Sequence, residues 1–361
     1  MNSSKQELDK LKIRFTKDNK IPIDVFEEEY WDFYISLYEN THQSRTKWLS
    51  LLEGIEKEYP SVQSFLDAFY KRREVMLQNL WSKTNKDGKN LMELFNSGEK
   101  KISSRDNIIS SFYNNEQEWL KNTQKKDVYN PEHVGEWFLS IDLRKANFQA
   151  MLWYNPEFFI GKSLKSGQSI DDLYYEWISK FEVRGEGTLN SYIRESKYFR
   201  EVIFGNLNPD RAIRIEKWMI AHVSEKVKVI LDTSKVQYKF MQHGSDEIVI
   251  KVEDYEKILN LLPILKQQVT DAPEVGPVDV KVELYQLEDL CLESNNGHKV
   301  EAYRKNHHDG KFVLKKVHKH YYAQVYEICY GIQPDEQERD LIFYSENEPA
   351  KFMHRIKKVI H

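Results

Sequence analysis

The sequence predicts an α+β protein in three parts: a helical first part, a central part that mixes strands with helices, and an α+β last part. Three observations predict this class. Apolar residues recur at helical spacing up to about residue 128, apolar runs of strand length follow Pro131, and alternating residues with hairpin turns occupy the last third. With 361 residues, 40% of them hydrophobic, the chain has room for two or three units with a core in each.

The first part is expected to be a helical N-terminal domain over residues 1–130. Its aromatic and apolar residues lie three or four positions apart, which is typical of the buried face of a helix. Breaks are expected at Pro60, at Lys86-Asp87-Gly88 and at Tyr129-Asn130-Pro131, the last being the domain boundary. The expected core residues are Trp31, Tyr34, Tyr38, Phe65, Leu66, Phe69, Tyr70, Met76, Leu77, Leu80, Trp81, Trp119 and Leu120.

The central part begins with a short apolar run, Trp137 to Asp142, which suits a buried strand that ends in a carboxylate. Helical segments are expected from Phe148 and over Ile170 to Phe181. Asn208-Pro209 is a typical helix start, with Asn as the cap and Pro in the first turn. A long helix is therefore expected to follow Pro209.

A hairpin is predicted between the β-rich residues 236–241 and 248–252, with Asp246 at its tip. A lone Asp in a turn usually bonds its own backbone, and this is the simpler interpretation of Asp246 taken alone. Asp142 closes one strand and Asp246 opens another, and the long helix between them supplies a crossover. Together they favour a β-α-β-β unit in which two carboxylates hold Mg²⁺.

The last part carries an alternating strand, Val280 to Tyr285, and a hairpin of residues 299–304 with 311–317 about Asp309-Gly310. The run from Lys315 to Tyr322 combines cations with aromatic side chains, as a groove that follows a nucleic-acid backbone would. Short runs of this kind are common. The candidates for nucleic-acid binding are Lys315, Lys316, Lys319 and Tyr321. The spacing of His307, His308, His318 and His320 matches no standard metal site, so these are interpreted as exposed hairpin histidines.

Composition limits the possible functions. The net charge of −4 means that a nucleic-acid partner would have to be met by a local basic groove. The two cysteines, Cys291 and Cys329, allow neither a disulfide framework nor a Cys-rich zinc site, and together with the polar first residues they predict a reducing, cytoplasmic setting without a membrane. Phosphate-binding Gly-rich loops and nucleophile elbows are absent from the sequence, so ATPase and hydrolase functions find no support.

The residues around the two acids resemble the signatures of palm-domain nucleotidyltransferases over about residues 135–255. Asp246-Glu247 before an apolar strand is similar to the third signature of reverse transcriptases. Asp142, followed by Ala146 and Phe148, is similar to their first signature. In family-B DNA polymerases the intervening helix carries a Lys, then an aromatic and a Gly, and Lys197 with Phe204 and Gly205 has that spacing. The family's Asn-Ser pair is replaced by Glu201-Val202, and His243-Gly244 stands where a tyrosine is usual.

This resemblance implies a polymerase-like palm over residues 131–255, with a fingers-like insertion at about 157–235 and an α+β thumb-like C-terminal region over 256–361. It implies metal-dependent nucleotidyl transfer, with chain extension from nucleoside triphosphates that is templated or untemplated. Mg²⁺ or Mn²⁺ would be the cofactor, and a nucleic-acid primer or template the partner. Asp142 and Asp246 would bind the metal, the Leu143 carbonyl would be a further ligand, and Glu247 a further catalytic acid.

Substrate-binding residues are implied on the same basis. Arg194, Lys197 and Arg200 are spaced by three, so they are expected on one helical face that meets the triphosphate; a solvated basic face is the simpler alternative. Asn147 stands where DNA polymerases and reverse transcriptases often have a bulky residue that blocks a ribose 2′-hydroxyl. Its smaller side chain predicts tolerance of ribonucleotides, unless Phe148 fills that space.

Two alternatives remain open. Gly244 to Ile248 also resembles the Gly-Gly-Asp-Glu-Phe signature of diguanylate cyclases, which favours a palm-type nucleotide cyclase. The long segment between Asp142 and Asp246 ranks the cyclase behind a polymerase, because compact cyclases need no such insertion. The second alternative is a palm-like structural or scaffold subunit without catalysis, which the near-neutral charge permits.

Overall fold

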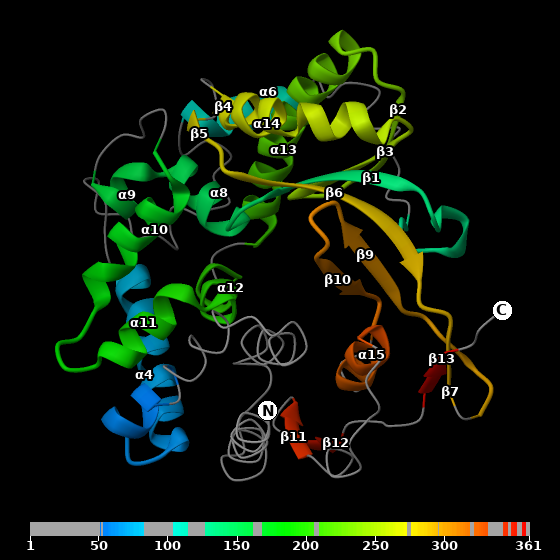
Figure 1. The fold of residues 1–361 in the computed structure, drawn as a ribbon. Helices are drawn as coiled ribbons and strands as arrows, with labels where there is room; N and C mark the ends of the chain where they lie inside the picture. The colour runs from blue at the N-terminus through cyan, green and yellow to red at the C-terminus, as the bar shows by residue number, and fades with distance from the viewer. Residues whose placement is uncertain are drawn as a thin grey trace.

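The fold is that of a computed structural model, which describes residues 51, 53–82, 104–114, 127–161, 168–205, 209–272, 276–294, 296–317, 321–330, 342–345, 348–351 and 356–358. Helices and antiparallel sheets both contribute to it (Figure 1). The α+β class that the sequence predicts is therefore confirmed.

Six strands of the described part form a central sheet in the order β10-β9-β6-β1-β3-β2. Every neighbouring pair in this sheet is antiparallel. The strands are β1 (Trp137–Leu143), β2 (Tyr238–His243), β3 (Glu247–Val252), β6 (Val280–Asp289), β9 (Tyr303–His307) and β10 (Phe312–Lys315). The predicted strand ending in Asp142 is thus present, and it lies between β6 and β3.

Two split β-α-β units produce this order. β1 and β2 are parallel to each other with β3 between them, and β3 and β6 are parallel with β1 between them. The long helix α13 (Pro209–Thr233) lies in the first connection and α14 (Tyr255–Thr270) in the second. The arrangement is the ferredoxin-like β-α-β-β-α-β motif. Strands from both sides of residue 255 share one sheet, so the boundary expected there does not coincide with an edge of the sheet.

The two faces of the central sheet differ because successive residues of a strand point to opposite sides. On the helix-covered face, Leu139, Ile141 and Leu143 join one buried core with apolar residues of α13 and α14. Figure 1 shows these two helices together on one side of β1, β3 and β6. The opposite face, called the polar face, carries Ser140, Asp142, Glu247, Lys281, Glu283, Lys305 and His307.

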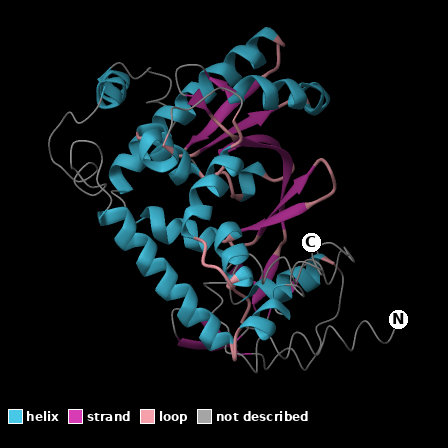
Figure 2. Cartoon of the chain, turned by 90° about the vertical axis from the view of Figure 1, so that its left-hand side faces the viewer, coloured by secondary structure: helices cyan, strands magenta, loops and turns pink. Residues whose placement is uncertain are grey.

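A group of helices lies beside the sheet, and Figure 2 shows the described helices and strands from a second direction. Its members are α4 (Val62–Ser82), α8 (Ala146–Tyr154), α9 (Pro156–Ile160), α10 (Ile170–Ile178), the 3-10 turn η3 (Ser179–Phe181), α11 (Gly187–Glu195) and α12 (Lys197–Gly205). Phe148 of α8 is 1% exposed, and its ring contacts the rings of Tyr174 and Trp177 in α10. The helices predicted from Phe148 and over Ile170 to Phe181 are therefore confirmed.

Helix α4 from the first part packs on this helical group. Phe69 is fully buried against the rings of Tyr192 and Phe199. Arg72 donates to the Phe181 carbonyl at 2.7 Å and pairs with Glu186. Six of the predicted core residues of α4 are thus confirmed, and a further one, Tyr70, is half-buried. The buried ones are Phe65, Leu66, Phe69, Met76, Leu77 and Leu80. Trp31, Tyr34, Tyr38, Trp119, Leu120 and the side chain of Trp81 lie outside the described residues.

The last third differs from its predicted hairpin in one respect. β8 (Lys299–Val300) pairs with β7 (Leu292–Ser294), which also pairs with β13 (Ile356–Lys358). The hairpin itself consists of β9 and β10, so its first strand begins later than predicted. Gly310 in its turn has a φ of 83°, a left-handed conformation that glycine adopts without strain.

Several further helices, turns and strands lie elsewhere in the described residues. They are α6 (Ser104–Asn114), the 3-10 turn η2 (Pro131–His133), β4 (Asp271–Ala272), β5 (Gly276–Pro277), α15 (Tyr322–Cys329), β11 (Ile342–Ser345) and β12 (Glu348–Lys351). Of the helices in the described ranges, none has the length and apolar character that a membrane span requires.

Candidate active site

The three acids that the sequence assigns to catalysis lie together at one end of the central strands. Asp142, near the end of β1, is the direct cross-strand partner of Glu247, the first residue of β3. The backbone N–H of Leu143 donates to the carbonyl of Asp246 at 2.8 Å. The fold therefore brings together acids that the chain separates by the whole helical insertion.

A tight turn between β2 and β3 presents Asp246. The Gly244 N–H donates to the Glu247 carbonyl at 2.7 Å, and a Cβ at Gly244 would approach that oxygen to 3.1 Å. The Ser245 hydroxyl donates to Asp246 Oδ1 at 3.1 Å. Asp246 thus stands at the tip of the hairpin, as predicted, and glycine at position 244 permits the close approach of the two strands.

The carboxyl group of Asp142 carries an uncompensated charge. Burial raises the pKa of Asp142 to about 7, with further contributions from the charges of Glu247 and Asp246. Lys281, its cross-strand neighbour on β6, lowers the pKa but does not offset these effects. A bound cation would favour the ionised carboxylate, because opposite charge nearby stabilises the charged form.

Glu216 adds an acid that the sequence analysis did not single out. It projects from α13 with only 4% of its surface exposed, and burial together with the charge of Asp246 raises its pKa to about 7. Its Oε1 atom has no hydrogen-bond partner among the described residues. The signal in the sequence was a charged residue directly beside Ile215 in the apolar stripe of a predicted helix, where burial of a carboxylate is costly.

Lys305 occupies the other half of the polar face and was also missed. Its side chain is 3% exposed, and its Nζ lies 3.7 Å from Glu247 Oε1 and 4.0 Å from Glu283 Oε2. The Ser140 hydroxyl donates to Glu247 Oε1 at 2.6 Å. Glu247 therefore already has two polar partners, which leaves Asp142 and Asp246 as the better candidates for metal ligands.

The donor set suits a hard cation. Mg²⁺ is commonly held by one or two carboxylates, with waters and substrate phosphates completing its coordination. Asp142 and Asp246 supply carboxylate oxygens, and Leu143, the third predicted ligand, lies between Asp246 and Val280 in the sheet. Within the described ranges no group of three or more His, Cys, Asp or Glu side chains is arranged to hold a metal ion. The residues fit an open two-carboxylate site and not a closed protein cage.

The predicted basic face for the triphosphate does not form as one helical surface. Ser196 has an extended backbone and separates α11 from α12; its hydroxyl accepts from the Phe199 N–H, as an N-cap does. Arg194 ends α11 and pairs with Glu182, whereas Lys197 begins α12 with 55% of its side chain exposed. The expectation of one face was wrong because a capping serine interrupts the helix.

Arg200 and Asn147 lie on helices of the group beside the sheet, Arg200 in α12 and Asn147 in α8. Arg200 lies over the Tyr174 ring at 5.7 Å and donates to the Glu195 carbonyl at 2.9 Å. Asn147 lies in the first turn of α8, half-buried. Phe148, the alternative residue for that space, is buried in the aromatic core.

The basic residues predicted to contact nucleic acid are only partly described. Lys315 lies over the Tyr129 ring at 5.8 Å, and Tyr321 is half-buried against the core. Lys316 pairs with Asp127 and, at 3.3 Å, with Glu301, so its charge is compensated. Lys319, His318 and His320 lie outside the described residues.

The histidine interpretation holds for one of the two described residues. His308 is exposed, as predicted, but the side chain of His307 is only 10% exposed and lies 3.8 Å from Glu283. Burial lowers the pKa of His307. His307 is therefore part of the polar face, because β9 pairs with β6 and directs it there.

Comparisons with known proteins add little. No family model and no curated protein matches the chain. Among solved structures, the POL domain of Pol1 from M. smegmatis, in complex with DNA primer-template and dNTP, is similar with a TM-score of 0.28 and 10% identity. The similarity covers 65% of this chain and 66% of that one, slightly less than two thirds of its length. Likeness at this level carries no argument, so function is argued from the residues of the site.

Proposed function

We propose that this chain is a metal-dependent nucleotidyltransferase in which Asp142 and Asp246 hold Mg²⁺ or Mn²⁺ beside a nucleoside triphosphate. One observation carries the proposal: the acids meet at one end of the central strands, and burial with mutual repulsion raises the pKa of Asp142 to about 7. Perturbed carboxyl groups of this kind are typical of functional sites. The resemblance of Asp142 and Asp246-Glu247 to palm signatures is independent of this geometry and supports the same activity.

The chemistry would be an in-line displacement at phosphorus. A substrate hydroxyl oxygen forms a bond to the α-phosphorus, the bond to the bridging oxygen breaks, pyrophosphate leaves with the electron pair, and the hydroxyl proton passes to solvent. When bound, the metal would neutralise charge on the phosphate oxygens and lower the pKa of the hydroxyl. Asp142 must be ionised to bind it, so activity should require a pH at which this proton is lost.

The surrounding residues have supporting roles in this proposal. Ser140 and Lys305 hold the carboxylate of Glu247, which fixes its orientation next to Asp142. Nucleic acid is the proposed acceptor, with Lys315 and Tyr321 as candidates for contact. The half-buried Asn147 in the first turn of α8 supports tolerance of ribonucleotides in this proposal, because Phe148 is buried in the aromatic core.

The test is nucleotide incorporation by the purified chain with labelled ribo- and deoxynucleoside triphosphates and Mg²⁺ or Mn²⁺, with and without a primed template. Asp142→Asn and Asp246→Asn should abolish the product. Glu253→Gln removes an exposed acid at the opposite end of β3 and should leave the product unchanged. A cyclic dinucleotide product would instead establish the cyclase alternative. Absence of any product, with divalent-cation binding equal in all four proteins, would contradict the proposal and favour a structural subunit.

A further inference from the structure

A second charged cluster begins directly after the acids, where the chain passes from β1 into α8. Arg144 and Lys145 follow Asp142 by two and three residues. Lys145 has a φ of 50° and a ψ of 46°, a left-handed conformation that is unusual for a residue with a side chain. Such a conformation persists only where the surroundings hold it. The contacts that hold Lys145 come from the helical insertion.

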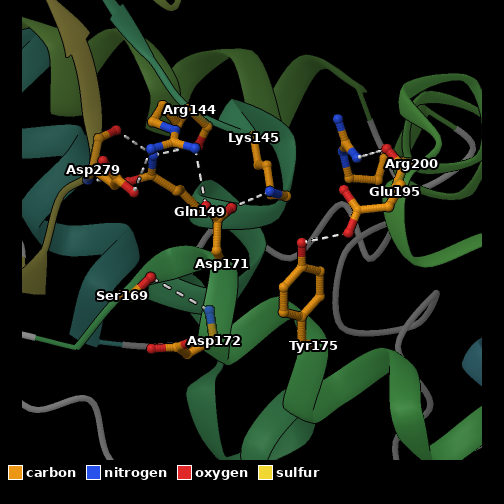
Figure 3. A network of polar contacts seen from close by, with 10 residues as sticks. All are labelled: Arg144, Lys145, Gln149, Ser169, Asp171, Asp172, Tyr175, Glu195, Arg200 and Asp279. Carbon is orange, nitrogen blue, oxygen red and sulfur yellow. Dashed lines mark hydrogen bonds and ion pairs between the residues drawn. The ribbon is translucent and has the colours of Figure 1, made fainter. Parts of the chain in front are cut away.

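Both oxygens of one carboxylate, that of Asp171 in the first turn of α10, are bound by these two cations. Arg144 Nη2 lies 2.9 Å from Asp171 Oδ2, and Lys145 Nζ pairs with Oδ1 (Figure 3). Burial raises the pKa of Asp171, but the hydrogen bond from Lys145 and the charges of Lys145, Arg144 and Arg200 hold it below its usual range. Three cations therefore act on one carboxylate.

Two tyrosine rings complete the cluster. Lys145 lies over Tyr174 at 5.6 Å and over Tyr175 at 5.9 Å, and Arg200 lies over Tyr174 at 5.7 Å. Figure 3 shows Tyr175, Glu195 and Arg200 beside the Lys145 and Asp171 pair. The cations therefore come from two separate elements, the β1–α8 turn and α12, and the carboxylate comes from α10. Cations that converge from separate elements on one small anion are suited to bind oxyanions.

We propose that Arg144, Lys145 and Arg200 form a binding site for the polyphosphate of a nucleotide, and that the Asp171 carboxylate occupies this site until a polyphosphate displaces it. The proposal rests on the proposed function, since it names where the triphosphate of that reaction binds. Two residues of extended chain span about 7 Å, so a polyphosphate at Arg144 would be within reach of Asp142. In this proposal Arg144 and Lys145 take the role in triphosphate binding that the sequence analysis assigned to Lys197.

Displacement has a consequence for the helical insertion. Asp171 belongs to α10, and its pairs with Arg144 and Lys145 connect α10 to the turn after β1. A polyphosphate offers more negative charge and more acceptor oxygens than one carboxylate, so it competes for the same donors. Binding would then release this connection between α10 and the turn.

The chain offers a matched control in the next residue. Asp172 lies in the same helical turn, is exposed, and its backbone N–H bonds the capping Ser169. Asp171→Asn and Asp172→Asn change the net charge equally, but only the first removes the carboxylate from the cations. Any difference between the two variants therefore reports on the site and not on overall charge.

The experiment is calorimetric titration of the metal-free chain with inorganic tripolyphosphate. Asp171→Asn should bind about tenfold more tightly than wild type, because the competing carboxylate is gone, while Asp172→Asn should equal wild type. Equal affinities of the two aspartate variants would overturn the proposal. Lys145→Met should lose binding, whereas Lys239→Met, at an exposed position on β2, should retain it. Retained binding in Lys145→Met would also overturn it, which covers the case in which Asp171→Asn does not fold.

Tripolyphosphate binding needs no nucleotide transfer, so the two proposals fail separately. A chain that incorporates no nucleotide but shows the expected difference between Asp171→Asn and Asp172→Asn would contradict the proposed function and support the anion site. A chain that incorporates nucleotides but shows no such difference would contradict the anion site alone.

Discussion

Asp142 and Glu283 lie on the same face of the sheet, on neighbouring strands, yet their carboxyl groups have opposite electrostatic environments. Burial acts to raise the pKa of both carboxyl groups. For Glu283 it is outweighed by a hydrogen bond from Lys281 and by the charges of Lys281, Lys305 and His307, so its pKa is lowered. For Asp142 nearby acids add to burial and raise the pKa to about 7. The part of the polar face around Glu247 and Glu283, called the compensated half, is therefore neutralised by the protein itself. Around Asp142 and Asp246, the described residues supply only the partial compensation of Lys281.

This difference distinguishes a structural charge cluster from a candidate site. Glu247 and Glu283 have a buried lysine between them, so their charges are part of the fold. Among the described residues, Asp142, Asp246 and Glu216 have no ion pair with a buried lysine, and burial raises the pKa of Asp142 and of Glu216 to about 7. Buried charge that the protein does not compensate is costly to keep, and it is expected where a ligand supplies the missing charge.

The largest expected effect is on catalysis. Asp142→Asn should lower kcat/KM for nucleotide incorporation by about 10³-fold, or roughly 4 kcal/mol, since it removes a proposed metal ligand. Glu283→Gln should lower it by about tenfold at most, because Glu283 belongs to the compensated half. Equal losses in the two variants, measured at a temperature where both are folded, would remove the distinction between the halves.

A somewhat smaller effect is expected on stability in the compensated half. Lys305→Met should reduce the free energy of unfolding by about 3 kcal/mol, because two carboxylates would lose their buried cation. Lys281→Met, with 57% of the Lys281 side chain exposed, should cost less than about 1 kcal/mol. Urea denaturation measures both, and a double variant with Glu283→Gln should recover part of the loss. Full stability in Lys305→Met would show that the two carboxylates do not depend on this cation.

A similar loss of stability is expected for a substitution on the opposite face of β1, directly beside the site. Ile141 is fully buried on the helix-covered face, and Ile141→Ala should cost about 2–4 kcal/mol of stability. Binding of Mn²⁺, measured by electron paramagnetic resonance below the melting temperature, should be unchanged. Loss of Mn²⁺ binding in the folded variant would indicate that the two faces are not independent.

The smallest expected effect is on the pH dependence of stability without metal. The folded chain holds a proton on Asp142 up to about pH 7, whereas the unfolded chain releases it near pH 4. Stability should therefore fall as pH rises from about 4 to 7, since the native state binds more protons in that window. At pH 8, Asp142→Asn should be more stable than wild type by about 1–2 kcal/mol, a value reduced for partial exposure. Thermal melts from pH 4 to 8 measure this, and parallel curves for the two proteins would contradict it.

Local patterns predicted much of the fold. β1, the β2–β3 hairpin and α13 were all predictable because strand alternation, turn residues and Pro209 at a helix start act over a few neighbouring residues. The position of Asp246 at the tip of the hairpin was predictable from the same turn residues. The acids could be assigned to one site because a crossover helix between two strands returns the chain to the same sheet.

The rest depends on contacts that the sequence pattern does not encode. Lys305 meets Glu247 only because β9 pairs with β6 and β6 pairs with β1, and no local signal fixes that order. The boundary expected at residue 255 assigned β6 and β9 to another domain, so their pairing with the sheet of β1 was not predicted. The break at Ser196 was a different case: serine before a helical segment is an N-cap signal, and it stood in the sequence between the two basic residues.

The most direct test of the central claim is the titration of the Asp142 carboxyl by ¹³C NMR, assigned by the signal lost in Asp142→Asn, with and without Mg²⁺. Without metal, a pKa of about 7 is expected, and Asp246→Asn should lower it. Saturating Mg²⁺ should lower it further, toward the ordinary range near 4. A pKa near 4 without metal, unmoved by Mg²⁺ or by Asp246→Asn, would contradict the claim that the acids form an uncompensated cation site.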